Sequence, residues 1–165
     1  MSSKTYVKSI LLSALVVLGL GGLLLHLRIH PVSQNPSNLV TVVSGVLSVL
    51  LVPLLFGFKK TIHYGYVLNG FLAIVGTVVM AHFSIAHWPT PATLRAILLQ
   101  TTLADILLLC GKFFVGKALF DLEFYGYDAK RQRKGIPHRY PHLGWWLIHL
   151  VLVAVVYYLG NRFWR

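Results

Sequence analysis

Residues 8–27 read KSILLSALVVLGLGGLLLHL, and only Lys8 and His26 in this run can carry a charge. A helix needs roughly 20 mainly apolar residues to cross the hydrocarbon core of a bilayer. The run therefore predicts a membrane-spanning helix. It is longer than the apolar part of a cleaved signal peptide, and no small-residue cleavage pattern follows it, so we expect it to be retained.

Four further windows have the same length and apolar character, at about 38–58, 64–86, 95–116 and 143–161. Proline and basic residues separate them, as in RIHPVSQNPSN, KKTIH and HWPTPAT, which are typical of turns and loops. The last connection, 117–142, is longer and basic. We expect the stretch GKALFDLEFYGY at its beginning to continue the fourth helix past the membrane. We predict an all-α integral membrane protein, one transmembrane domain over 1–165, built as a bundle of about five helices.

The composition supports this class. The chain has 165 residues, of which 56% are hydrophobic and 12% charged, and its mean hydropathy is +0.71. Soluble domains usually contain about 25% charged residues. The net charge of +11 does not indicate nucleic-acid binding, because the basic residues flank apolar runs and no recognition fold surrounds them.

The distribution of lysine and arginine predicts the orientation, since cytoplasmic loops are enriched in these residues. With the N-terminus inside, four arginines fall outside, and Lys112 lies within a span. The inner side then holds ten basic residues: Lys4, Lys8, Lys59, Lys60, Lys117, Lys130, Arg131, Arg133, Lys134 and Arg139. We expect an N-in, C-out protein, with a bacterial inner (cytoplasmic) membrane as its location.

Asp105 lies in the middle of the fourth predicted span, where a carboxylate costs about 2.5 to 3.5 kcal/mol on insertion scales. Helical spacing places Thr101, Asp105 and Lys112 on one stripe. Asn69, with Thr77 close by, marks a stripe of small and polar residues on the third span, and His149 lies on a stripe of the fifth. By depth, we expect Asn69, Thr77, Asp105, Lys112 and His149 to form a polar seam in the inner half of the membrane.

Two interpretations of this seam are open. It is a proton path, or a pocket for a quinone or lipid headgroup, because carboxylate and imidazole groups pass protons and Lys or Asn can hold a carbonyl oxygen. Alternatively, it is a hydrogen-bonded clasp between helices, as buried polar residues often form in membrane proteins. In a variant of the clasp, Asp105 meets a charged residue of a partner subunit.

The chain contains eight histidines, and four of them, His26, His30, His82 and His87, lie near the outer ends of the first and third spans. His26 and His82 share a depth, as a b-type haem requires of its axial ligands, although His82 points away from the small-residue stripe. His87 lies on that stripe at the membrane edge. We keep His26, His82 and His87 as candidate haem ligands. A divalent-metal site of His26, His30 and His87 is the weaker alternative, and we predict no metal site because no carboxylate or cysteine accompanies these histidines on that side.

No phosphate-binding glycine loop, nucleophile elbow or zinc-binding helix motif is present. Any catalysis would therefore belong to the seam or to partner subunits. We interpret the chain as a small membrane subunit or anchor of a larger complex that handles electrons, protons or quinone, with membrane or peripheral subunits as partners. The alternatives are a purely structural assembly subunit without a cofactor, and a small transporter or lipid-processing membrane protein.

Overall fold

The computed structural model describes residues 2–29, 38–81, 103–127 and 143–163, together with Arg95 and Lys130. These segments are helical. They are α1 (Ser3–Ile29), α2 (Asn38–Val46), the π-helical turn η2 (Leu47–Leu51), α3 (Val52–Gly57), α4 (Ile62–Ala81), α6 (Leu103–Tyr125) and α8 (Leu143–Phe163). The predicted all-helical architecture is confirmed for the described part of the chain.

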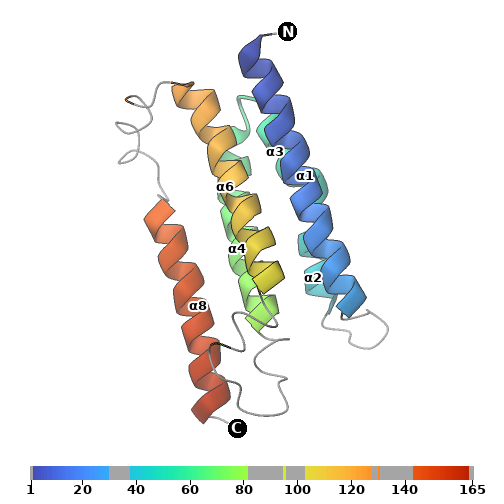
Figure 1. Cartoon of the computed structure of the whole chain (residues 1–165), viewed down its shortest axis with the longest axis vertical. Helices are drawn as coiled ribbons and strands as arrows, with labels where there is room; N and C mark the ends of the chain where they lie inside the picture. Colours follow the sequence, from blue (N-terminus) through green and yellow to red (C-terminus); the bar gives the residue numbers. More distant parts are fainter. Residues whose placement is uncertain are drawn as a thin grey trace.

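Successive helical rods alternate in direction, and α2, η2 and α3 form one continuous rod (Figure 1). The helix α6 packs against both α1 and α4. The rod α2–η2–α3 packs against α1 and α4, and α8 packs against α4. The two chain ends lie at opposite ends of the molecule (Figure 1).

Three of the described helical segments are long and apolar enough to cross a membrane: Ser3–Arg28, Asn38–Gly57 and Ile62–Val79. They correspond to the first three predicted windows. The second window differs from a regular helix because of η2 at its middle. Part of the fourth window, 96–102, lies outside the described residues, as do 82–86 of the third.

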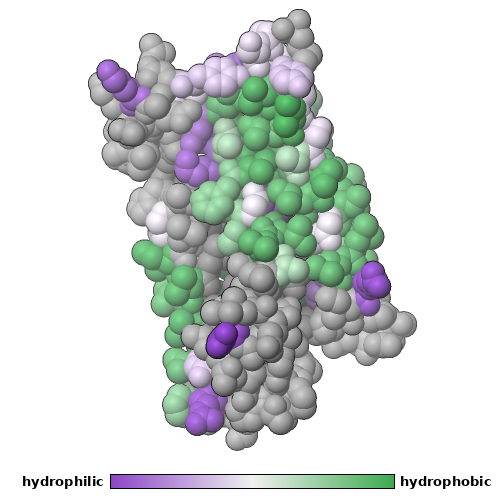
Figure 2. Space-filling view, viewed as in Figure 1, coloured by the Kyte–Doolittle hydropathy of each residue, from purple (hydrophilic) through white to green (hydrophobic). Residues whose placement is uncertain are grey.

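The exterior of these helices is apolar. Large side chains such as Val17, Leu50 and Leu107 are 67%, 65% and 63% exposed. In the space-filling view, hydrophobic residues cover the middle of the described surface, and most strongly hydrophilic ones lie toward its ends (Figure 2). Water would penalise such a surface, whereas lipid tails match it.

The helix α6 extends beyond the predicted span, as the sequence GKALFDLEFY predicted. It ends at Tyr125, and Gly126 follows with a positive φ of 62°, the conformation in which glycine commonly terminates helices. The additional turns bury Leu119 and Phe120 in the core with Phe56 and Tyr66. The core therefore reaches the end of the bundle at which the N-terminus lies.

Gly116 allows α6 to approach α4 closely. A methyl group at this position would overlap the Asn69 side chain and lie 3.3 Å from the Phe56 ring. Both side chains are fully buried, so neither has free space to move into. Gly116 thus sets the distance between the two helices near the polar seam.

We predict that Gly116→Ala destabilises the protein by about 1 to 3 kcal/mol, the usual cost of overpacking a core. The measurement is the midpoint of unfolding in detergent. The matched control is Gly22→Ala, because an added methyl at Gly22 meets no described atom within 4 Å and alanine favours the helix. Equal losses in the two variants would contradict this account.

Candidate functional site

The most unusual buried residue in the bundle is Lys112 on α6. Its side chain is 4% exposed, and its Nζ donates a hydrogen bond to Ser48 Oγ at 2.7 Å. An ammonium group in an apolar bundle is expensive unless it is hydrogen-bonded or paired. The Ser48 hydroxyl supplies one acceptor, whereas an ammonium has three donors.

Ser48 lies in the π-helical turn η2, where the Val52 N–H donates to Leu47 O, five residues earlier. The adjacent Pro53 accounts for the widened turn. Proline has no N–H, and its ring collides with the carbonyl four residues before it in a regular helix. Widening the turn relieves this collision without breaking the rod, and π-turns of this kind are frequent at functional sites.

A cavity of about 90 Å³ lies beside Lys112, between α1, α2, α4 and α6. Its polar lining comprises Lys112, Ser48, Ser44, Thr41 and His26. The rest of the lining is apolar or glycine, and consists of Leu18, Gly19, Gly22, Leu23, Gly45, Leu72, Gly76, Val79, Leu108 and Leu109. The polar groups follow the rod from η2 toward the beginning of α2.

Glycines make room for this cavity and for the packing around it. A methyl group at Gly76 would lie 2.6 Å from Leu109 Cδ2, and one at Gly45 would overlap Leu23. Both leucines line the cavity. Larger residues at these two positions would push the leucines into the open space or separate the helices.

Two polar groups lie toward the other end of the cavity. The Thr41 hydroxyl oxygen is buried and has no hydrogen-bond partner among the described residues. The His26 Nε2 lies 3.1 Å from Asn38 Oδ1, which connects the end of α1 to the beginning of α2. The cavity therefore offers a hydroxyl group and an imidazole in addition to the Lys112 ammonium.

Of the predicted seam residues, the structure brings Asn69 and Lys112 together. Asn69 is 1% exposed, and its Nδ2 donates to the backbone oxygen of Lys112 at 3.3 Å. Asn69 Oδ1 is buried with no partner among the described residues. The Asn69 side chain therefore links α4 to α6 directly.

The other seam residues are placed differently. Thr77 donates to Ala73 O at 2.9 Å within α4. His149 Nδ1 lies 2.7 Å from Trp145 O, and its ring stacks on the Trp145 ring with centroids 3.8 Å apart, both within α8. The backbone of Asp105 belongs to α6, but its side chain lies outside the described part, as do His82 and His87 entirely. The haem pairing with His26 stays a prediction.

Sequence reasoning missed Ser48, Ser44 and Thr41. Their spacing of three and four residues places them on one face of a helix, which was the available signal. Pro53, at the middle of an otherwise regular apolar run, was the signal for η2. The hydroxyl residues and Pro53 gave weaker sequence signals than Asp105, because neither a hydroxyl group nor a proline carries a charge.

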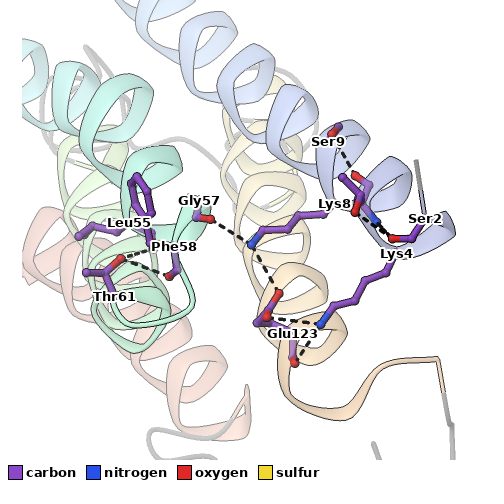
Figure 3. A network of polar contacts seen from close by, with 10 residues as sticks. Ser2, Lys4, Lys8, Ser9, Leu55, Gly57, Phe58, Thr61 and Glu123 are labelled. Carbon is purple, nitrogen blue, oxygen red and sulfur yellow. Dashed lines mark hydrogen bonds and ion pairs between the residues drawn. The ribbon is translucent and has the colours of Figure 1, made fainter.

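A second cluster of polar side chains lies at the end of the bundle where the N-terminus lies (Figure 3). Lys4 and Lys8 of α1 reach across to Glu123 of α6, with N–O distances of 3.3 and 3.4 Å. Lys8 also donates to Gly57 O at 3.1 Å, and nearby Lys117 pairs with Asp121. Partial burial opposes ionisation of Glu123, but the charges and hydrogen bonds of Lys8 and Lys4 outweigh it and lower the pKa of this carboxyl.

We predict that Ser48→Ala destabilises the protein by about 1 to 3 kcal/mol, because the buried Lys112 ammonium loses its described acceptor. The control is Ser13→Ala, since Ser13 is an exposed serine of α1 and its loss leaves no buried donor unpaired. Unfolding midpoints measured in one detergent compare the two. A Ser48→Ala loss no larger than that of the control would contradict the importance of this bond.

We predict that Glu123→Gln lowers the free energy of unfolding by about 1 to 3 kcal/mol at neutral pH, as charge-assisted hydrogen bonds are lost. Because the folded-state pKa is lowered, this contribution is present above the unfolded pKa of about 4.3. It disappears as the pH falls through the lower folded-state value. The difference between wild type and Glu123→Gln should thus be constant from about pH 8 to 5 and shrink below about pH 4.

Unfolding curves at several pH values test this, with Lys60→Met as the control for an exposed charge of the same end. The control should follow the wild-type pH profile. A difference that persists unchanged in acid would show that Glu123 acts through packing and not through its charge.

Comparison of the chain with protein-family models, with curated proteins and with solved structures found no match. Its function is therefore inferred from its own residues and their geometry.

Proposed function

We propose that this chain is a five-span, N-in and C-out membrane subunit or anchor of a larger complex, and that its polar interior takes part in proton handling. The three apolar helices support the membrane location. The helix α6 covers 103–116 of the fourth predicted window, and α8 (Leu143–Phe163) covers the fifth. These two complete the proposed count of five.

The proposed orientation is supported by the grouping of basic residues. Lys4 and Lys8, the turn with Lys59 and Lys60, and Lys117 near the end of α6 all belong to one end of the bundle. Positive charge gathers on the cytoplasmic side of membrane proteins. In a bacterial inner membrane, this end would face the cytoplasm.

The observation that carries the functional proposal is the buried ammonium of Lys112 beside a hydroxyl-lined cavity. Ionisable residues inside membrane proteins commonly mark proton and ion pathways. A cavity of about 90 Å³ with polar partners has room for water molecules. Water, Ser48 and Lys112 together can pass a proton along hydrogen bonds.

A quinone ring is a less favourable occupant. An empty cavity of about 150 Å³ is the size known to hold benzene, and this cavity is smaller. A substituted quinone would enter only if lining side chains such as Leu23 or Leu109 moved. Lys112 could still donate to a carbonyl oxygen in that event, so quinone extraction belongs in the test.

The second candidate is a structural subunit without a cofactor, which the Asn69 contact favours. A buried amide that joins α4 to the backbone of α6 is typical of polar side chains that hold membrane helices together. In this case Lys112 and Ser48 would fix the position of the rod α2–η2–α3 and would carry no proton.

We predict that Lys112→Met leaves the assembly intact and lowers proton flux at least about tenfold, because a buried proton-binding group is removed. The tagged protein is isolated in mild detergent with its accompanying chains, and flux is followed in proteoliposomes with an entrapped pH-sensitive dye. Lys60→Met, an exposed lysine of the turn after α3, is the matched control.

The same preparation is examined by visible spectroscopy and quinone extraction. Loss of the accompanying chains in Lys112→Met, with no flux in the wild type, would support the structural alternative. A wild-type chain whose protein mass, after subtraction of the bound detergent, is 18.5 kDa in every mild detergent, with no accompanying chain, would contradict the role as a subunit.

A further inference from the structure

The Lys112 ammonium has no carboxylate partner among the described side chains. The ion pairs of the described residues involve Lys4, Lys8 and Lys117. Lys112 donates to the neutral Ser48 hydroxyl. An uncompensated charge in an apolar interior is strongly unfavourable, so a charged lysine at this position calls for an anion close by.

The described acids are engaged elsewhere. Glu123 meets Lys4 and Lys8, and Asp121 meets Lys117. Both acids lie nine or more residues after Lys112 on α6, toward the end of the bundle that holds the N-terminus. The backbone of Asp105 lies seven residues before Lys112, about 10.5 Å along the helix axis at 1.5 Å per residue.

The cavity beside Lys112 provides space for an anion from solution. Its volume is about 90 Å³, and it extends from Lys112 and Ser48 to Thr41 and His26. The part of the lining that the structure describes contains no acidic side chain. The buried Thr41 hydroxyl, which lacks a partner among the described residues, can serve a water molecule or a second polar atom.

We propose that this cavity binds one small monovalent anion, of the size of a halide, nitrate or formate, against the Lys112 ammonium. One buried cation matches one negative charge. A divalent anion such as sulfate would leave an uncompensated charge and lose more hydration energy. The cavity extends from Lys112 to His26, near the end of α1.

This site goes beyond the proposed function and does not depend on it. Anion binding can be present in a protein that conducts no protons, and proton flux can be present without a bound anion. Binding is therefore measured on the purified full-length chain at equilibrium, with no flux assay and no partner subunit required.

The probe is chloride, and the readout is broadening of its ³⁵Cl NMR signal by the protein in detergent micelles. We expect saturable broadening that nitrate and formate remove and that sulfate, at equal ionic strength, leaves in place. Lys112→Met should reduce it at least about tenfold, since charge-assisted hydrogen bonds are among the strong ones. The control Lys60→Met should retain it.

A second variant guards against misfolding of Lys112→Met. Ser44→Leu keeps every charge and fills the cavity, so it should also abolish the saturable broadening. The absence of saturable broadening in wild type would overturn the proposal, as would its persistence in Lys112→Met or Ser44→Leu. Chloride binding that is absent from wild type and appears only in the Asp105→Asn variant would also overturn the proposal, because Asp105 would then be the natural counter-ion of Lys112.

Discussion

The burial of one ammonium group organises the interior of this protein. Lys112 needs acceptors inside a bundle whose walls are mostly leucine, valine and glycine. Ser48 is presented to it by a turn of the neighbouring rod. The backbone oxygen of Lys112 accepts a hydrogen bond from the Asn69 side chain of α4. Three helical rods are thus positioned around a single residue of α6.

The two ends of the bundle differ in how their side chains pack. At the end with the N-terminus, aromatic and aliphatic side chains such as Phe56, Phe113 and Phe120 fill the core, and the ion pairs of Glu123 close it. Beyond Lys112, glycines and hydroxyl groups replace this packing and leave a cavity. The densely packed core and the glycine-lined cavity therefore occupy different levels of the same bundle.

Much of the fold could be predicted from sequence, because membrane spans have a strong signal in length and apolar content. The helix over Ile62–Ala81, the rod over Asn38–Gly57 and the extension of α6 through Tyr125 follow from apolar runs and their turns. The proximity of Asn69 to Lys112 followed from counting depth along antiparallel helices.

The cavity could not be predicted in the same way. It depends on the contacts of Gly45 with Leu23 and of Gly76 with Leu109, which are tertiary contacts between helices. The Lys112 partner was equally hidden, because a serine in an apolar run has no distinctive pattern until the opposite helix is placed. The contacts of His149 could not be predicted either. Its place on one stripe of the helix did not indicate that its ring would stack on Trp145 of the same helix.

The π-turn at Leu47–Leu51 has a consequence for the evolution and engineering of the rod. Such a turn holds one residue more than an α-helical turn. The residues after it are therefore rotated by about 100°, the angle of one residue, from where an unbroken α-helix of the same sequence would place them. Deleting a single residue within this turn would restore a regular helix and leave Phe56 on the same face of the rod relative to Asn38. A deletion in the regular helical parts of this rod would instead turn the following residues by about 100°, so η2 is the place in the rod where one residue can be lost without moving the α3 face, at the expense of the turn that presents Ser48 to Lys112.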